Sequence, residues 1–175
     1  IRYYRVPLLS QICRVYIELS RNTPLLVQLV FIYFGLPKLG IVYSGETSAV
    51  IGVVFLGASY MAETMRSGLE SVDHMQKESA LSLGMTKKQA MQYVILPQAI
   101  AVAVPAIFAN VIFLIKETSV VSIIAVPDLM YVAKDLIGND YRTNEALFML
   151  VIFYMIIILP ITLIAGYAER RMRHA

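Results

Sequence analysis

The chain has 175 residues, of which 58% are hydrophobic and only 15% are charged. Soluble domains of this size carry about 45–50% apolar and about 25% charged residues, and here the apolar excess is gathered into long blocks. This pattern is typical of an integral membrane protein rather than of a large soluble core. The net charge of +3 is modest, and the cations lie at the edges of the apolar blocks, which argues against a nucleic-acid-binding protein.

The first apolar block is too short to cross a bilayer as one straight helix. Residues 1–21 precede it and mix arginines and tyrosines with apolar residues, a composition that suits the lipid headgroup layer. Residues 24–36 would form about 20 Å of helix, whereas the hydrocarbon core is about 30 Å thick. The first span therefore either begins before this stretch or bends at Gly35 and Pro37 and continues to about Tyr43. We favour the bent helix.

Three further blocks predict membrane helices, and together with the first they predict an all-α protein of four spans. They cover residues 47–65, 97–115 and 147–168. The last two contain Pro105 and Pro160, and proline is tolerated in membrane helices where neighbouring groups satisfy the freed carbonyls.

A polar stretch, residues 67–96, separates the second block from the third. Asp73 begins one predicted helix, and Gly84 follows where a left-handed C-terminal cap is wanted. Thr86 with Gln89 forms a capping pattern that begins a second helix, which ends before Pro97, the joint to the third span. We expect a helical hairpin with an exposed corner at Gly84. The pattern alone leaves open whether this corner is a docking surface or an ordinary loop.

Counting lysines and arginines orients the chain. With four spans, the N-terminal segment, the polar stretch and the C-terminal tail share one side of the membrane. That side holds Arg2, Arg5, Arg14, Arg21, Arg66, Lys77, Lys87, Lys88, Arg170, Arg171 and Arg173, and the other holds Lys38, Lys116, Lys134 and Arg142. The positive-inside rule therefore places the polar stretch and the C-terminus in the cytoplasm.

The polar stretch also carries a spaced motif. Its positions are Glu78, Ala80, Gly84, Val94, Leu96 and Pro97. They resemble the EAA signature of ATP-binding-cassette importer permeases, with Ser79 in place of the second motif residue and Val94 in place of isoleucine. The runs ELSRNTPLLVQLVFIYFGLP and IKETSVVSIIAVPDL resemble the polar amino acid branch of that family. The resemblance covers nearly the whole chain.

The resemblance implies a fold, a role and partners. It implies one transmembrane domain over residues 1–175 with the type I importer fold, in which residues 67–96 form the coupling-helix loop seated in a cytoplasmic ATPase. It implies a multi-pass protein of the bacterial plasma (inner) membrane that imports amino acids with a second, identical or different permease and an external binding protein. Members of this branch usually have five spans, so we expect the first to be missing from this sequence.

The chain offers no catalytic or metal-binding pattern of its own. The only cysteine, Cys13, lies in the N-terminal stretch, and the two histidines lack metal-ligand spacing. No G-x-x-x-x-G-K-[ST] motif occurs that could cradle phosphates. We expect a transporter subunit that is not an enzyme and binds no cofactor, with ATP and Mg²⁺ on a partner ATPase. The alternatives are a stand-alone ion-coupled transporter, which would need carboxylates well inside its spans, and a membrane scaffold or enzyme.

Polar residues at membrane depth are candidates for a substrate pathway, because burying them in lipid is costly. The candidates are Gln28, Glu63, Asn110, Lys116, Glu117, Thr118 and Ser119. An amino acid zwitterion needs a cation for its carboxylate and an anion for its ammonium group, and Lys116 with Glu117 offers both. The other interpretation is that these two residues mark the outer interface or pair to hold two helices together.

Overall fold

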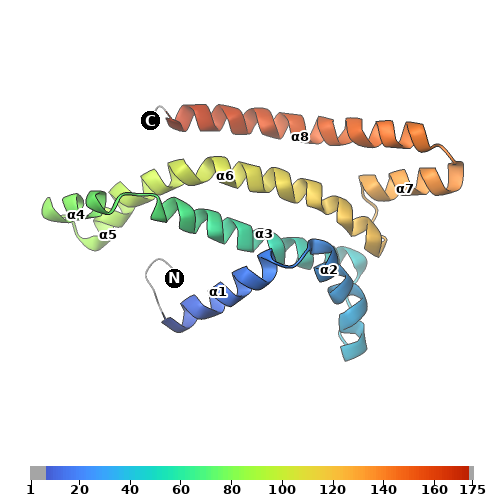
Figure 1. Ribbon diagram of the computed structural model, residues 1–175, viewed down its shortest axis with the longest axis horizontal. Coiled ribbons are helices and arrows are strands. Elements are labelled where there is room, and N and C mark those ends of the chain that lie inside the picture. The colour runs from blue at the N-terminus through green and yellow to red at the C-terminus, as the bar shows by residue number, and fades with distance from the viewer. Residues whose placement is uncertain (1–6, 174–175) are drawn as a thin grey trace.

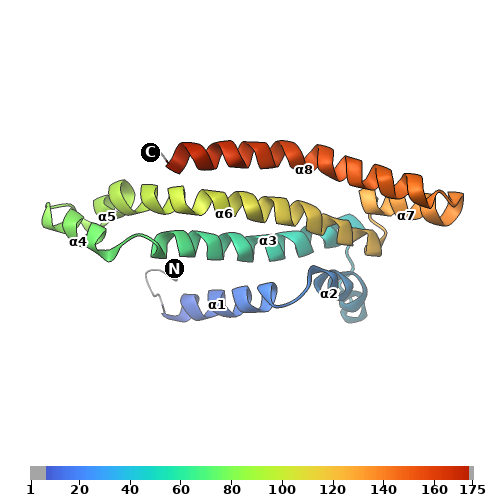
Figure 2. The ribbon, with the colours of Figure 1, turned by 45° about the horizontal axis from the view of Figure 1, so that its top comes forward.

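The computed structural model describes the backbone of residues 7–173 and the side chains of residues 8–170, and all regular secondary structure in this part of the chain is helical. The α-helices are α1 (Pro7–Arg21), α2 (Leu25–Val30), α3 (Gly45–Glu70), α4 (His74–Ser82), α5 (Lys87–Ala90), α6 (Leu96–Glu117), α7 (Leu129–Asp140) and α8 (Thr143–Arg173). Helices α3, α6 and α8 run lengthwise beside one another, with α4 and α5 at one end and α7 at the other (Figures 1 and 2).

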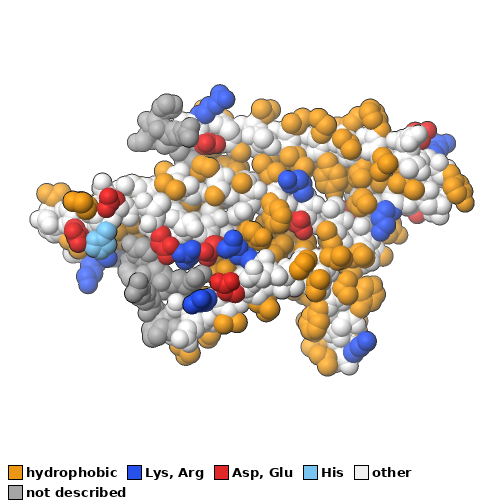
Figure 3. Space-filling view, viewed as in Figure 1, with side chains coloured by type: hydrophobic (Ala, Val, Ile, Leu, Met, Phe, Trp, Pro, Cys, Tyr) orange, Lys and Arg blue, Asp and Glu red, His pale blue; other side chains and the backbone are white. Residues whose placement is uncertain are grey.

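Three helical stretches of the described chain are long and apolar enough to cross a membrane. They are Gly45–Glu70, Lys87–Ile124 and Thr143–Arg170, with 26, 38 and 28 residues. They contain the second, third and fourth blocks predicted from the sequence, and they confirm the all-α membrane fold. The surface of α8 is largely hydrophobic in Figure 3, as expected for a helix that faces lipid.

The first predicted span is a broken helix. The apolar helix Leu25–Leu39 bends beyond Gly35, as expected, but it ends at Gly40 in a left-handed conformation rather than at Tyr43. Helix α1 precedes it and packs against α3 (Figure 2). Hydroxyls of Tyr16 and Ser20 both donate to the carbonyl of Phe55, at 2.6 and 3.0 Å. The first apolar block is therefore a short helix that follows α1 after a break, and it is not among the three stretches long enough to cross a membrane.

Two π-helical segments stand immediately before Leu-Pro pairs. Phe31–Gly35 precedes Leu36 and Pro37, and Met91–Ile95 precedes Leu96 and Pro97. Proline cannot donate to the carbonyl four residues earlier, and the wider turn accommodates the missing bond. The leucine amides bond to Phe31 and Met91, five residues back. The expected joint at Pro97 is therefore wrong, because the helix that begins at Lys87 continues through it into α6.

Small residues allow α3 and α6 to approach closely. A Cβ atom on Gly68 would lie 2.6 Å from the carbonyl oxygen of Ala99 and 2.9 Å from the Cβ of Ala103. Ala99 and Ala103 are both buried. Further along, Asn110 donates from Nδ2 to Oγ1 of Thr64, at 2.7 Å. Small-residue contacts supplemented by polar bonds are how membrane helices associate, since lipid offers no hydrophobic driving force.

The described apolar core lies at the opposite end of α3 from α4. It joins α2 and the start of α3 to the 3₁₀ segment Thr118–Ile124 that follows α6. Its buried members are Leu25, Leu29, Ala49, Leu56, Val121 and Ile124. This core fixes the far end of α6, so the long helix that begins at Lys87 is anchored away from the polar hairpin.

Candidate functional site

The polar hairpin has the caps that its sequence predicts. Asp73 accepts a bond from the Met75 amide at 2.9 Å and begins α4. Gly84 has a φ of +84°, the left-handed region that glycine occupies without a Cβ penalty. Thr86 and Gln89 form a reciprocal capping box that begins α5. These local predictions are confirmed.

The inner face of the hairpin is held by small and branched apolar residues. Ala80 of α4 is 3% exposed, and it faces α5 and the π-helical segment, where Ala90 and Ile95 are also buried. The outer face is open. Leu83 is 81% exposed beside Gly84, and a Cβ on Gly84 would meet nothing within 4 Å. The corner is therefore sterically accessible to a partner protein.

The other motif residues are likewise divided between exposed and more buried positions. Glu78 is exposed and pairs with His74 one turn earlier, with 3.1 Å between Oε1 and Nδ1. Val94 is half-buried, whereas Leu96 and Pro97 are exposed on the continuous helix. The motif residues therefore lie at the exposed corner, on the buried inner face of the hairpin and near the beginning of the long helix Lys87–Ile124.

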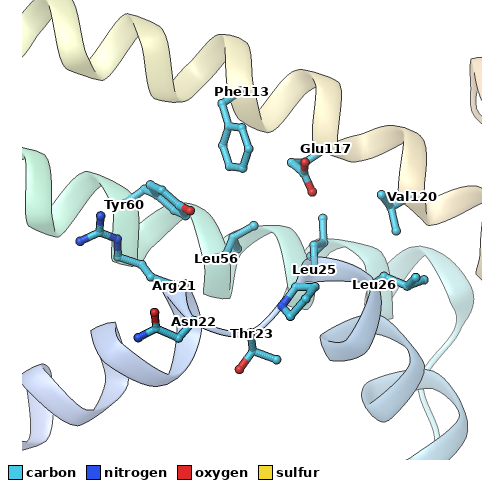
Figure 4. A pocket seen from close by; sticks show the side chains of 11 residues that line it. Arg21, Asn22, Thr23, Leu25, Leu26, Leu56, Tyr60, Phe113, Glu117 and Val120 are labelled. Carbon is cyan, nitrogen blue, oxygen red and sulfur yellow. The ribbon is translucent and has the colours of Figure 1, made fainter.

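A first cavity of about 430 Å³ lies beside the break between α1 and α2. We call it the distal cavity, because it is the farther from α4. It is lined by Arg21, Asn22, Thr23, Pro24, Leu25, Leu26, Leu56, Tyr60, Phe113, Glu117 and Val120. Figure 4 shows the carboxylate of Glu117 pointing from α6 into it, toward α2 and α3. This volume lies within the range of ordinary small-molecule sites, about 300–1,000 Å³.

A second cavity of about 480 Å³, the proximal cavity, continues along α3 and α6 toward α4. Its lining is Arg21, Tyr60, Glu63, Thr64, Ser67, Gly68, Ser71, Val102, Ala103, Ala106 and Asn110. Hydroxyl, amide and charged groups here alternate with small residues. The cavity therefore offers hydrogen bonds and space together, which a passage for a polar solute requires.

A chain of charges crosses from α1 to α3 between the cavities. The Arg21 guanidinium carbon lies 5.1 Å from the centre of the Tyr60 ring, and its nitrogen is 3.8 Å from Oε1 of Glu63. Glu63 also pairs with Arg66, which in turn pairs with Glu70. Acidic and basic side chains gather between α1 and α6 in Figure 3. Pairing of this kind lowers the cost of holding charges within a span.

The pathway residues predicted from the sequence divide into two groups. Glu117 lines the distal cavity, and Glu63 and Asn110 line the proximal one. Lys116 is exposed on α6 and lines neither, so it does not face the same space as Glu117. Thr118 and Ser119 also lie outside both linings.

Gln28 has a different place from the one expected. It is 8% exposed, and its Nε2 donates to the carbonyls of Ser20 and Thr23, both at 3.0 Å. These carbonyls lie at the break between α1 and α2, where the regular helix bonds stop. Gln28 is absent from the linings of the distal and proximal cavities, although it lines a separate, mostly apolar cavity of about 400 Å³, and its amide bridges the break between α1 and α2.

Sequence reasoning missed Arg21 and Tyr60. Arg21 was counted among surface charges, yet it contacts Tyr60, which is about 22 Å along α3 from Gly45 and so near its middle. One sequence signal was available for Arg21. This residue is followed by Asn-Thr-Pro, a helix-breaking sequence, and then by an apolar block that is too short to span a bilayer. Arg2 and Arg5 lie outside the described residues. Among the described residues, no group of three or more His, Cys, Asp or Glu could hold a metal ion.

The family model described as binding-protein-dependent transport system inner membrane component matches residues 2–174. The chain is 37% identical to a probable amino-acid ABC transporter permease protein, PatM, of Vibrio harveyi, over 100% of this chain and 80% of the relative. It is 32% identical to the glutamine transport system permease protein GlnP of Escherichia coli K12, over 94% of this chain and 76% of that relative.

Solved structures agree on the fold. One, described as an amino acid ABC transporter with histidines, superposes with a TM-score of 0.89 at 37% identity, covering 95% of this chain and 78% of the other. The inward-facing MetNI methionine ABC transporter superposes with a TM-score of 0.78 at 18% identity, covering 97% and 78%. The second likeness concerns the fold alone. The chain belongs to the family of binding-protein-dependent transport system inner membrane components, the membrane-embedded permease subunits of ABC importers.

Proposed function

We propose that the chain is the permease subunit of an ATP-driven amino acid importer in the bacterial plasma membrane. Its relatives named as amino-acid, glutamine and arginine permeases support the substrate class. The working unit would contain a second permease, a cytoplasmic ATPase that binds ATP and Mg²⁺, and an extracytoplasmic amino acid-binding protein. Residues 1–175 would form one transmembrane domain, with residues 67–96 as its coupling loop and the C-terminus in the cytoplasm.

The observation that carries this proposal is the continuity between the exposed hairpin corner and a membrane helix. The helix from Lys87 to Ile124 has 38 residues, about 57 Å, and begins three residues after Gly84. Packed α-helices behave as rigid bodies in hinge and shear motions. A partner that moved the corner would therefore move the α6 wall of the proximal cavity relative to the far end of α6, which the core holds.

Substrate would pass through the distal and proximal cavities. Glu117 is suited to an ammonium group in the distal cavity, and Asn110 offers an amide in the proximal one. Lys116 would remain outside this route, as a charge near the far membrane surface.

A stand-alone ion-coupled transporter is not favoured by the family membership of the chain. Of the two carboxylates that line the cavities, Glu63 is paired with Arg21 and Arg66, and Glu117 is the one that we assign to the substrate ammonium group.

The proposal is tested by comparing Gly84→Glu with Gly40→Glu. Gly84 and Gly40 have φ values of +84° and +81°, and a Cβ on either meets nothing within 4 Å, so the two substitutions share the same backbone strain. They lie at opposite ends of the membrane helices. In proteoliposomes containing the ATPase and binding protein, Gly84→Glu should abolish ATPase binding and amino acid uptake, and Gly40→Glu should preserve ATPase binding. Equal behaviour of the two variants would contradict the coupling role.

A further inference from the structure

The two cavities follow one another along the same pair of helices. On α3 the distal cavity is lined by Leu56 and Tyr60, whereas the proximal cavity begins at Tyr60 and continues to Ser71. The distal cavity is lined by Phe113 and Glu117 of α6 and by Val120 of the 3₁₀ segment that follows, whereas the proximal cavity is lined by α6 residues between 102 and 110. Tyr60 and Arg21 line both cavities. A solute that moves from one cavity to the other along α3 and α6 must therefore pass these two side chains.

Tyr60 is held in place from two sides. The Arg21 guanidinium lies over its ring, 5.1 Å from the centre, and the Phe113 ring of α6 packs against it at 5.2 Å between centres. Helices α1, α3 and α6 therefore each contribute one side chain to the partition. In Figure 4 the Arg21 guanidinium lies beside Tyr60 and points away from Glu117.

The contact between Arg21 and Glu63 is loose compared with the other ion pairs nearby. Its N–O separation is 3.8 Å, whereas charge-assisted hydrogen bonds are about 2.7–2.9 Å long. Arg66 bonds to Glu63 with both Nε and Nη2, so the Glu63 carboxylate keeps a partner when Arg21 leaves. The planar guanidinium of Arg21 is suited to receive a different carboxylate in two-point contact.

We infer that Arg21, resting on Tyr60, is a carboxylate-binding gate between the distal and proximal cavities. The α-carboxylate of the transported amino acid replaces Glu63 on Arg21, and the cation then leaves the Tyr60 ring and opens the partition. This inference rests on the proposed function, because it takes an amino acid as the solute. It assigns to Arg21 the cationic role that the sequence suggested for Lys116.

A purely structural role for Arg21 makes a different prediction. Helix α1 is already joined to α3 by the bonds from Tyr16 and Ser20 to the Phe55 carbonyl. If Arg21 only adds to this attachment, its replacement should lower stability without changing which solutes the cavities accept. The decisive measurements are therefore the permeability of the partition and the preference for a carboxylate.

The first experiment measures the partition. Val120 lines the distal cavity, and the chain has a single cysteine, so Cys13→Ser with Val120→Cys places one reporter thiol there. In inside-out vesicles containing the permease and a cysteine-free ATPase, a membrane-impermeant thiol reagent is added from the α4 side. We expect Arg21→Ala with Tyr60→Ala to raise the labelling rate about tenfold, equivalent to a barrier about 1.4 kcal/mol lower, since the partition loses both side chains. Arg14→Ala, exposed on the same helix, should leave the rate unchanged.

The second experiment measures the preference for a carboxylate in the permease–ATPase complex in nanodiscs, with the binding protein omitted. The probes are radiolabelled L-glutamine, L-arginine and L-histidine, each competed with its α-amide. Wild type should prefer the acids, and Arg21→Met should reduce that preference about tenfold or more, as expected for loss of a charged hydrogen bond. Arg14→Met is the matched control. If the Arg21→Met permease does not assemble with the ATPase, Arg21→Lys is used instead. We then expect weaker binding of the amino acids and unchanged binding of their α-amides.

The outcomes separate the gate from the proposed function. If the wild-type permease with its ATPase and binding protein takes up none of the three amino acids, the proposed function and the gate are both contradicted. If uptake occurs but the Arg21 variant retains its acid preference, or the labelling rate stays at the parent value, only the gate is overturned. A faster labelling rate together with a lost acid preference supports it.

Discussion

Gly68 of α3 lies against Ala99 of α6 so closely that a Cβ on Gly68 would come within 2.6 Å of the Ala99 carbonyl oxygen. Gly68→Ala should therefore force the two helices apart and destabilise the fold by about 1–3 kcal/mol, the usual cost of overpacking. Thermal unfolding in detergent would measure the loss. Gly166→Ala is the control, because a Cβ on Gly166 in α8 meets nothing within 4 Å. Equal melting temperatures for both variants would contradict the close contact.

Gln28 should contribute to stability rather than to substrate affinity. Gln28→Leu removes the amide group that donates to the carbonyls of Ser20 and Thr23 at the break. Leaving buried polar groups unpaired costs about 1–3 kcal/mol. We expect lower thermal stability with an unchanged KM for uptake. Gln98→Leu is the control, since Gln98 is exposed and makes one local bond to Val94. A raised KM with normal stability would return Gln28 to the pathway.

Asn110 and Thr64 should be energetically coupled through their hydrogen bond across α3 and α6. A double-mutant cycle with Asn110→Ala and Thr64→Val is expected to give a coupling energy of about 0.6–1.7 kcal/mol, the range found for such bonds in membrane proteins. Thermal unfolding of the two single variants and the double variant supplies the cycle. Strictly additive effects would show that the bond does not contribute.

Glu117 should bind the substrate ammonium group, whereas its neighbour Lys116 should not take part. Glu117→Gln removes the charge that faces the distal cavity, and a charge-assisted bond is worth about 1.5–3 kcal/mol, so KM should rise at least about tenfold. Lys116→Ala should leave KM unchanged because Lys116 lies outside both cavities. Initial uptake rates in proteoliposomes measure KM for both variants. A raised KM for Lys116→Ala with an unchanged KM for Glu117→Gln would contradict this assignment.

Leu83 should be part of the ATPase contact without affecting the fold of the chain. Leu83→Asp introduces a charge at the exposed corner, and we expect ATPase binding to weaken about tenfold, equivalent to about 1.4 kcal/mol. The melting temperature should not change, because Leu83 is 81% exposed. Leu39→Asp, 73% exposed at the other end of the helices, is the matched control. Unchanged ATPase binding in the Leu83 variant would place the contact elsewhere on the hairpin.

Local chemistry explains which parts of the fold could be predicted from the sequence. The caps at Asp73 and Thr86 and the corner at Gly84 depend on neighbours within a few residues, and their residue types determine them. The three long spans follow from hydropathy and length in the same way. The continuity of the helix through Pro97 was missed, because proline commonly ends a helix and the π-helical turn before each Leu-Pro pair was not considered.

The gap in the site prediction has a physical origin too. Arg21 contacts Tyr60 and Glu63, both about 40 residues away along the chain. The composition around Arg21 resembles a headgroup segment, because arginines and tyrosines alternate there with apolar residues. Likewise, Lys116 and Glu117 are adjacent in sequence, but neighbours on an α-helix point about 100° apart, so only Glu117 faces the cavity.

The unbroken helix from Lys87 to Ile124 has a thermodynamic consequence. If binding of the ATPase at the corner changes the affinity of the distal cavity for its solute, occupancy of that cavity must change the affinity for the ATPase by the same factor. Amino acid binding in the cavity would then change the affinity of the permease for the ATPase through the same helix that transmits ATPase motion to the cavity. Titrating the ATPase against the permease, with and without bound amino acid, would measure both directions of this linkage.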